Sequence, residues 1–359
     1  MLKTFKYRIY PTKEQTKKIE QTLYLCRYLY NNALEQRITV YEKHNISLSY
    51  TKQANELKYV KQALNEYRSI HSQVLQDVLK RLDRSFQNFF RRLNTNEKPG
   101  FPRFQGKNRY NSFTYPQSGF SLKDNKIKLS KIGNIRMNLH RKLSGELKTC
   151  TIMHKNNRYY VALVCEVENP KIRFTDKAVG IDLGISHLAI TSDGEFYNNP
   201  KYLRKSDRQL KRLQRIVSKR KKGSHRRRKA VQLLAKKHEQ IANQRKDTNH
   251  KVSRKLINEY DLIVFEDLNI KGMVKNKHLA KNIHEVSWNQ LINFTMYKAE
   301  NAGKKVKLVN PHNTSQQCSS CGEIVKKTLA QRKHICSCGY TAHRDINASI
   351  NILHRGLSA

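Results

Sequence analysis

The sequence predicts an α+β protein of several domains, in which a small β-barrel with a helical insertion precedes an α/β domain with an inserted cysteine-rich segment. Three observations predict this architecture. A strand, a helical block and several strands follow one another up to about residue 168, and apolar strands alternate with helical stretches after it. Four cysteines lie within 21 residues near the C-terminal end. At 359 residues, the chain is long enough for two or three domains of about 150 residues each.

The first ten residues alternate between apolar and polar side chains as a strand does, and Pro11 ends the pattern. Thr12 followed by Gln15 is a capping-box pattern, in which two side chains satisfy free N–H groups at a helix start. It predicts a helix that runs to about Gln36. Cys26 falls on the apolar stripe of this helix, so it is expected to be a small core residue and not a reactive thiol.

A second helix is predicted over residues 72–93, with an apolar stripe on one face. Its opposite face could be solvated or could lie on phosphates, and carries Lys80, Arg81, Arg84, Arg91 and Arg92. Residues 98–118 mix Pro and Gly with basic and aromatic side chains, which predicts a loop or an edge strand. Strands are expected over 119–168, where Cys165 alternates with apolar residues, and Asn169-Pro170 is expected to end the domain.

The remainder of the chain predicts an α/β domain. Residues 177–183 and 188–191 are apolar strand patterns, and the turn residues Asp193-Gly194 lead into a third strand at 195–197. Residues 201–230 then hold 15 Lys or Arg and one acid, with a stripe of leucine and valine at helical spacing. Like charges four positions apart destabilise a helix by about 0.2–0.5 kcal/mol each, so this helix pair is expected to lie along a phosphate backbone. The expected contacts are Lys211, Arg212, Arg215, Lys219, Arg220, Arg226 and Arg227.

The net charge points to the kind of partner. Lys and Arg number 71 against 28 Asp and Glu, a formal net charge of +43. Such an excess repels itself across a folded surface, and a polyanion would relieve the repulsion. No uninterrupted apolar run approaches the ~18 residues of a membrane span, and the first residues do not form a signal-peptide pattern. We therefore expect a cytoplasmic protein that binds nucleic acid and no membrane.

The cysteine-rich segment predicts a zinc ribbon. Two closely spaced pairs, Cys318 with Cys321 and Cys336 with Cys338, supply four thiolates that can converge on one Zn²⁺. The second pair is C-x-C, a tighter spacing than usual, so nearby histidines, His334 and His343, are possible substitutes for the fourth ligand. Four thiolates leave no open coordination position, which predicts a structural and not a catalytic ion.

Acidic residues stand at three places in the chain where a carboxylate is costly to bury. Asp182 lies inside an apolar strand between two glycines, Asp345 begins a predicted helix, and the acids Glu266 and Asp267 end the apolar strand 262–265. A buried carboxylate is costly unless it is paired or binds a cation. Each also has a simpler explanation, as a turn, a surface strand end or a helix cap. Neighbours along a strand face opposite sides, so only one of Glu266 and Asp267 can point inward.

Together, Asp182, Glu266 and Asp345 predict a catalytic site that binds two Mg²⁺ ions. Phosphodiester hydrolysis by two ions needs bridging acids from different elements, and Mg²⁺ prefers oxygen ligands. An acidic strand with a hairpin, a second acidic strand and an acidic helix start form the layout of an RNase H-like nuclease core. The GIDLG stretch around Asp182 also resembles the first phosphate loop of actin-like ATPases, but further glycine-rich phosphate loops are not visible in the sequence.

An ordered set of motifs runs along nearly the whole chain: YRIYPTKEQ, LYLCRYLYNNALE, KPGFPRFQGK, GIDLG, FEDL, CSSCG with CSCG, and RDINASINIL. With these motifs the chain resembles the TnpB (OrfB) proteins of insertion sequences, relatives of the small type V CRISPR effectors. Two departures are the C-x-C pair and His343, which stands before Arg344-Asp345 where the family often has Asp. Neither removes a carboxylate.

The resemblance implies an RNA-guided DNA endonuclease of a transposable element, which cuts next to a short target-adjacent motif. Its partners would be target DNA and a guide RNA derived from the transposon end, and we expect a monomer bound to RNA at the nucleoid of a prokaryotic cell. Alternatives are a transposase and a nuclease-inactive RNA-guided DNA-binding repressor. The implied domains are a β-barrel wedge (1–10 and 99–170), a helical recognition lobe (11–98), a RuvC-like nuclease core (171–311 and 340–359) and the zinc ribbon (312–339).

Overall fold

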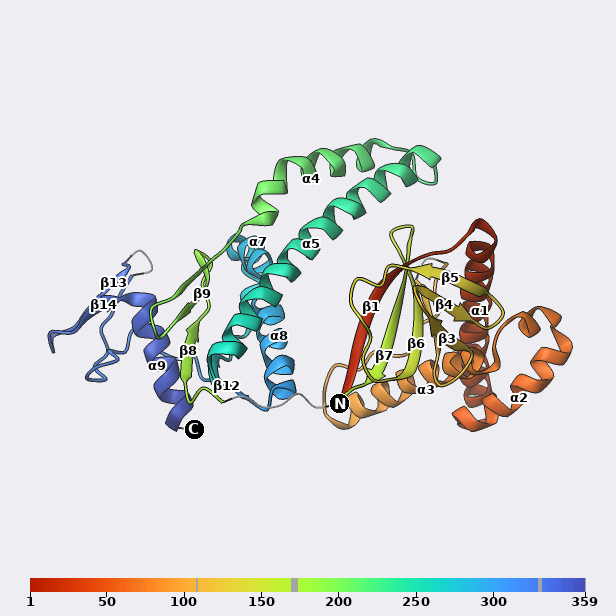
Figure 1. The fold of residues 1–359 in the computed structure, drawn as a ribbon, viewed down its shortest axis with the longest axis horizontal. Helices are drawn as coiled ribbons and strands as arrows, with labels where there is room; N and C mark the ends of the chain where they lie inside the picture. The colour runs from red at the N-terminus through yellow and green to blue at the C-terminus, as the bar shows by residue number, and fades with distance from the viewer. Residues whose placement is uncertain (108, 169–173, 329–330, 359) are drawn as a thin grey trace. The chain divides into compact units, whose positions relative to one another are not determined.

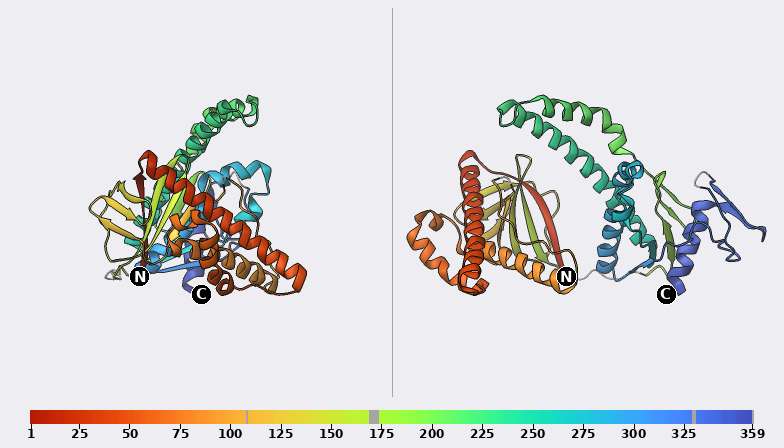
Figure 2. Two further views of the ribbon diagram at one scale, coloured as in Figure 1. Left: turned by 90° about the vertical axis from the view of Figure 1, so that its right-hand side faces the viewer. Right: turned by 180° about the vertical axis from the view of Figure 1, so that it is seen from behind.

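The computed structural model describes residues 1–107, 109–168, 174–328 and 331–358, apart from the side chains of 277–279 (Figures 1 and 2). The chain divides into two compact units, Met1–Glu168 and Asn169–Ala359. The predicted boundary at Asn169-Pro170 lies outside the described residues. Within the described ranges, no helix is both long and apolar enough to cross a membrane.

The first unit is a seven-stranded antiparallel sheet with helices inserted after its first strand. Its strands lie in the order β2-β6-β7-β1-β5-β4-β3. The strands are β1 (Leu2–Tyr10), β2 (Ser112–Tyr115), β3 (Phe120–Lys123), β4 (Lys126–Leu129), β5 (Gly133–Met137), β6 (Glu146–Lys155) and β7 (Arg158–Glu166). The inserted helices are α1 (Lys13–His44), α2 (Tyr50–Ala63), the 3-10 helix η1 (Asn65–Ser69) and α3 (Ser72–Asn94). The predicted order of strand, helical block and strands is therefore confirmed, and residues 98–118 do hold an edge strand, β2.

The start of α1 was predicted correctly, but its end was not. Thr12 and Gln15 form the capping box, and Cys26 is fully buried. The helix continues past Gln36 to His44, and Asn45 ends it in the left-handed conformation. The sequence pattern missed this last part because its buried residue is a charged one, Arg37.

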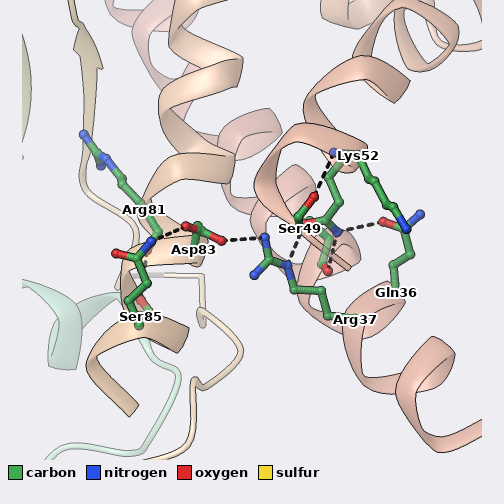
Figure 3. A network of polar contacts seen from close by, with 10 residues as sticks. Gln36, Arg37, Ser49, Lys52, Arg81, Asp83 and Ser85 are labelled. Carbon is green, nitrogen blue, oxygen red and sulfur yellow. Dashed lines mark hydrogen bonds and ion pairs between the residues drawn. The ribbon is translucent and has the colours of Figure 1, made fainter. Parts of the chain in front are cut away.

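Arg37 is the centre of a polar network that joins α1, α2 and α3 (Figure 3). Its Nε donates to Gln53 Oε1 over 2.8 Å, and one terminal nitrogen donates to Asp83 Oδ1 over 3.1 Å. Gln53, which is also buried, donates in turn to the carbonyl of Ala33 and to Gln36. A buried guanidinium is tolerated only with such partners, so the network fixes how the three helices pack.

The basic face predicted for α3 is interrupted by Arg81. Its guanidinium pairs with Asp77 over 2.7 Å and donates to the Ser112 carbonyl and the Thr114 hydroxyl of β2. Arg81 therefore joins α3 to the sheet, and neither of the two environments predicted for this face, solvent or phosphates, describes this residue. The apolar stripe is buried at Val74 and Leu82 but not at its end, where Leu93 is exposed.

The second unit is built on a five-stranded sheet in the order β10-β9-β8-β11-β12. Strands β8 (Ala178–Asp182), β11 (Leu262–Glu266) and β12 (Lys305–Val309) are parallel, while β9 (His187–Thr191) and β10 (Phe196–Asn198) form an antiparallel extension. One face packs against α5 (His225–Glu259) and α8 (Trp288–Asn301), and the other against α9 (Arg344–Ser358). Two shorter helices, α6 (Ile270–Met273) and α7 (Lys277–Val286), follow β11.

Two elements extend from this layered core (Figures 1 and 2). Helix α4 (Tyr202–Lys219) and the first half of α5 form an antiparallel hairpin that projects away from the sheet. The hairpin β13 (Lys333–Ile335) and β14 (Thr341–His343) lies beside α9, on the side away from the sheet. Helix α9 is thus held between the five-stranded sheet and the cysteine-rich segment.

Candidate active site and zinc centre

Side-chain alternation places two of the predicted acids on one face of the five-stranded sheet. Strands β8 and β11 are parallel, with Val264 beside Gly180. The apolar residues on either side of these two pack toward α5 and α8. Gly180 and Val264 therefore face α9, and so do the residues two positions further along, Asp182 and Glu266. The two acids end neighbouring strands at the same edge of the sheet.

Helix α9 brings the third acid to this edge. It lies so close to β8 that an ideal Cβ on Gly180 would be 2.0 Å from the carbonyl oxygen of Ser349. The Ser349 hydroxyl oxygen lies 3.0 Å from the Ile190 carbonyl oxygen. Asp345 lies one helical turn before Ser349, about 6 Å along the axis. Asp182 lies two residues beyond Gly180, also about 6 to 7 Å along the strand. Both acids therefore reach the same level.

The electrostatics of Asp182 reflect this convergence. Its pKa is raised well above the ordinary range, first by burial and then by the negative charges of Glu266 and Asp345. The Arg344 guanidinium and the Leu183 N–H oppose the rise. Like charges that share a site are relieved by a cation between them. Three carboxylates from separate elements are also the oxygen donors that Mg²⁺ prefers, so this set fits the ion predicted from the sequence.

Glu266 is the inward member of its pair. It is 6% exposed, while the neighbouring Asp267 is exposed. Burial raises the pKa of Glu266, and a hydrogen bond from Thr314 and the charge of Arg355 act against this. The Thr314 hydroxyl is 2.5 Å from Glu266 Oε1.

Asp345 lies between two arginines. Arg344 Nε donates to Asp345 Oδ1 over 2.9 Å, and a terminal nitrogen of Arg332 is 3.8 Å from Oδ2. His343, the departure noted in the sequence, accepts a hydrogen bond at Nδ1 from the Asp345 N–H over 3.3 Å. His343 therefore supports the backbone of the helix start, and it lies outside the cluster of four cysteine sulfurs.

The four predicted zinc ligands do converge. The sulfurs of Cys318, Cys321, Cys336 and Cys338 all lie within 4.8 Å of one another. Two of the separations are 3.8 Å (Cys318 to Cys338) and 3.6 Å (Cys321 to Cys336). A tetrahedral ion with Zn–S distances of about 2.3 Å has S···S edges of about 3.8 Å, so the cluster fits Zn²⁺.

His334 lies beside this cluster but outside the set of four sulfurs. It is fully buried and its Nδ1 contacts Lys327 Nζ. Burial alone would raise the pKa of Cys318, but N–H groups of the following turn and the His334 side chain bring it down to about 6. The lowered pKa favours the thiolate form of Cys318, which is the form that binds zinc. The C-x-C spacing needs no substitute ligand.

Comparisons with known proteins identify the family of this chain. Family models match residues 162–277 (OrfB of IS605, "Probable transposase"), residues 288–352 ("Cas12f1-like, TNB domain") and residues 1–45 (the helix-turn-helix domain of OrfB). A "Putative RNA-guided DNA endonuclease" of Streptomyces pristinaespiralis is 32% identical, over 99% of this chain and 90% of the relative. The chain belongs to the TnpB (OrfB) family. A second relative, "Putative RNA-guided DNA endonuclease InsQ" of Escherichia coli (strain K12), is 31% identical over 99% of this chain and 92% of its own length.

Solved structures share the fold of this TnpB-family chain. A Cas12f1 protein in complex with sgRNA and target DNA matches with a TM-score of 0.63 at 13% identity, over 98% of both chains. The RNA-guided endonuclease Cas_phi3 matches with a TM-score of 0.55 at 11% identity, over 99% of this chain and 92% of the other. At these identities the likeness concerns the fold alone.

The seven basic residues predicted to contact nucleic acid all lie on the α4–α5 hairpin. Lys211, Arg212, Arg215 and Lys219 belong to α4, Arg220 follows it, and Arg226 and Arg227 begin α5. All are exposed except Arg227, which is half-buried. Lys211 pairs with Asp207 one turn earlier, yet remains 62% exposed. The hairpin of this family member therefore presents its charge to solvent.

Sequence reasoning missed several residues around the acids. Thr314 contacts Glu266, Arg332 and Arg344 flank Asp345, and Arg355 lowers the pKa of Glu266. A signal for Arg355 was present, because Asn347, Asn351 and Arg355 recur every four residues on α9 and so share one face. No local pattern marks Thr314, since 48 residues separate it from Glu266.

Proposed function

We propose that this chain is an RNA-guided DNA endonuclease that hydrolyses phosphodiester bonds at Asp182, Glu266 and Asp345. The observation that supports this most is the convergence of the three carboxylates, seen in the charges of Glu266 and Asp345 that raise the pKa of Asp182. Two relatives that match over nearly the whole chain carry the name of such an enzyme. The parallel β8 and β11 with an antiparallel extension also support a RuvC-type, RNase H-like core over residues 171–311 and 340–359.

The three carboxylates would hold two Mg²⁺ ions, which supply Lewis-acid stabilisation to the attacking and leaving oxygens of the phosphodiester. The protein's own part is to orient the acids. Gly180 sets the distance between Asp182 and α9, and Arg344 and Arg332 hold the Asp345 carboxylate from two sides. Thr314 donates a hydrogen bond to one carboxylate oxygen of Glu266, which would leave the other oxygen to bind metal.

The four cysteines would bind one structural Zn²⁺ in the ribbon, residues 312–339. A segment with few apolar residues gains its fold from metal binding, worth about 10–16 kcal/mol in small fingers. The ribbon contacts α9, the helix that carries Asp345. Zinc would therefore stabilise the position of a catalytic residue without taking part in hydrolysis.

The nucleic-acid partners would be a guide RNA from the transposon end and a target DNA. The exposed basic side chains of the α4–α5 hairpin are candidates for the phosphate contacts. In such complexes base pairing supplies the sequence specificity, and the protein reads the backbone, the duplex shape and a short adjacent motif. The chain would act as a monomer bound to RNA at the prokaryotic nucleoid.

The first unit would supply the wedge domain and the recognition lobe. We propose that its seven-stranded sheet, residues 1–10 and 99–170, coils into the barrel of a wedge domain. In support, Tyr115 of edge strand β2 donates to the Ser130 carbonyl beside β4 and packs against Phe120 of the other edge strand, β3. The helices of residues 11–98 would form the recognition lobe.

The test is cleavage of a plasmid by the purified protein with its copurifying RNA and Mg²⁺. Asp182→Ala, Glu266→Gln and Asp345→Asn should each abolish guide-directed double-strand breaks and leave RNA binding intact. Asp267→Asn is the matched control, because this neighbouring acid points outward, and it should cut like the wild type. Cutting by Asp182→Ala would refute the site. Strand-joined products without a guide would favour a transposase, and guide-directed binding without cutting would favour a repressor.

A further inference from the structure

The segment Thr314–Ser319 connects the two sites just described. It leads into the first zinc ligand, Cys318, and its first residue touches the catalytic acid Glu266. We propose that Thr314 is a positioning residue, held by Asn351, which fixes the orientation of the Glu266 carboxylate. This inference rests on the proposed function.

The contact between Thr314 and Glu266 is buried and short. Thr314 is 2% exposed and its Oγ1 lies 2.5 Å from Glu266 Oε1. The same hydroxyl is 3.1 Å from the Pro311 carbonyl oxygen. A hydroxyl has a single proton to donate, and O–H···O⁻ bonds to an ionised carboxylate are about 2.5–2.7 Å long. The distances therefore indicate that the proton goes to Glu266.

This hydrogen bond orients the Glu266 carboxylate. A hydroxyl that donates to one oxygen over 2.5 Å selects one rotation of the carboxylate plane. The second oxygen is then left for the side where Asp182 and Asp345 lie.

Thr314 is in turn held by the helix that carries Asp345. Asn351 Nδ2 donates to the Thr314 carbonyl over 2.9 Å and to the Gln317 carbonyl over 2.7 Å. One turn earlier, Asn347 donates to the Gln317 carbonyl over 2.7 Å and accepts from the Ser319 N–H over 2.9 Å. Both asparagines are buried. Helix α9 therefore places Asp345 directly, and Glu266 through Asn351 and Thr314.

A purely structural role for Thr314 would be to close the turn at Pro311. The two roles predict different results for conservative substitutions. Serine keeps the hydroxyl for both acceptors, whereas valine keeps the size of threonine and removes the hydroxyl. Only loss of the bond to Glu266 should weaken metal binding by the carboxylates.

The experiment compares Thr314→Val, Thr314→Ser and a matched control in the full-length protein. The control is Thr295→Val, because Thr295 is also fully buried but its hydroxyl donates to a helix carbonyl, that of Leu291. Guide-directed cleavage is measured in single turnover against Mg²⁺ concentration at one pH. Binding of Mn²⁺ is measured separately by electron paramagnetic resonance, without nucleic acid.

We expect Thr314→Val to raise the Mg²⁺ concentration needed for half-maximal cleavage by about tenfold, since a hydrogen bond to a charged group is lost. Binding of Mn²⁺ should weaken by a similar factor. Thr314→Ser should restore both, and Thr295→Val should change neither. If valine at 314 prevents folding, Thr314→Ala gives the same comparison.

The inference is overturned if Thr314→Val keeps the wild-type dependence on Mg²⁺ and the wild-type Mn²⁺ binding. It is also overturned if Thr314→Ser behaves like Thr314→Val. Failure of the wild-type protein to cut would instead refute the proposed function. The Mn²⁺ arm needs no cleavage, so in that case it still decides whether Thr314 acts on Glu266.

Discussion

Replacing Gly180 with alanine is expected to displace α9 and with it Asp345. The added Cβ would lie 2.0 Å from the Ser349 carbonyl oxygen and 2.6 Å from the Leu353 nitrogen. Both are backbone atoms of α9, so no side-chain rotation can relieve the contact. Since real Cβ atoms keep at least 3.0 Å from such atoms, the helix must move by about 1 Å or more.

The size of the effect follows from this displacement. Overpacking of this kind costs about 1–3 kcal/mol. For a unit of this size each kcal/mol lowers the unfolding temperature by about 2–4 °C. A shift of about 1 Å in a group that positions the reaction can cost about 100-fold in rate. Cleavage should therefore fall by far more than the loss of stability alone explains at 25 °C.

Calorimetric unfolding and single-turnover cleavage of Gly180→Ala test this expectation. The control is Gly106→Ala, because an ideal Cβ on Gly106 meets nothing within 4 Å. An alanine at 180 that unfolds and cuts like the Gly106→Ala control would refute the reasoning. It would mean that α9 is not held against β8 at this point, and that Asp345 is placed by other contacts.

Four further expectations concern charge and metal. Asp182→Asn should abolish cleavage yet raise the unfolding temperature in buffer without Mg²⁺. The pKa of Asp182 is raised in the folded state, so the carboxyl group destabilises the fold at any pH above its unfolded-state pKa of about 3.9. The stability gained by Asp182→Asn should therefore disappear as the pH falls to about 3.9. Zinc analysis should find one ion per chain, and a strong chelator should release it and unfold the ribbon; a folded, active preparation without zinc would contradict this. Burial lowers the pKa of Lys298 to about 8 in the folded state, whereas its unfolded-state pKa is about 10.4. The free energy of unfolding should therefore rise with pH between these two pKa values. Urea unfolding of Lys298→Met should show no such rise. Replacing Lys211, Arg212 and Arg215 together with alanine should change how RNA binding depends on salt. The slope of the logarithm of the RNA-binding constant against the logarithm of salt concentration, measured by filter binding, should become shallower by roughly 2 to 3. An unchanged slope would show that α4 does not contact the RNA.

Local pattern was enough to predict the strands and helices around the acids. The apolar strands ending in Asp182 and Glu266 were predictable because alternation and burial leave a direct mark on sequence. The sequence left two candidates for the acid that points inward, and in the structure Glu266 is buried while Asp267 is exposed. The four cysteines were predictable because a metal ion imposes short spacings.

Features that depend on tertiary contact were not predictable. Helix α1 continues beyond Gln36 because Arg37 is paired with Asp83, a partner 46 residues away. Helix α5 extends to Glu259, well beyond the basic stretch, because its second half packs on α8. Thr314 looks like any polar residue before a cysteine until Glu266 is placed beside it. Each of these depends on a contact far along the chain, which no window of neighbouring residues contains.

The position of α9 has a consequence for the folding of the protein. Helix α9 comes after every other element that lines the acids, and it completes the site only by docking between the sheet and the ribbon. The acids come from segments far apart in sequence, and closing such long loops is a late and costly step in folding. A partly folded chain, or one that has opened locally at α9, therefore lacks the full set of carboxylates. Any activity that needs all three carboxylates therefore requires the whole unit to have formed.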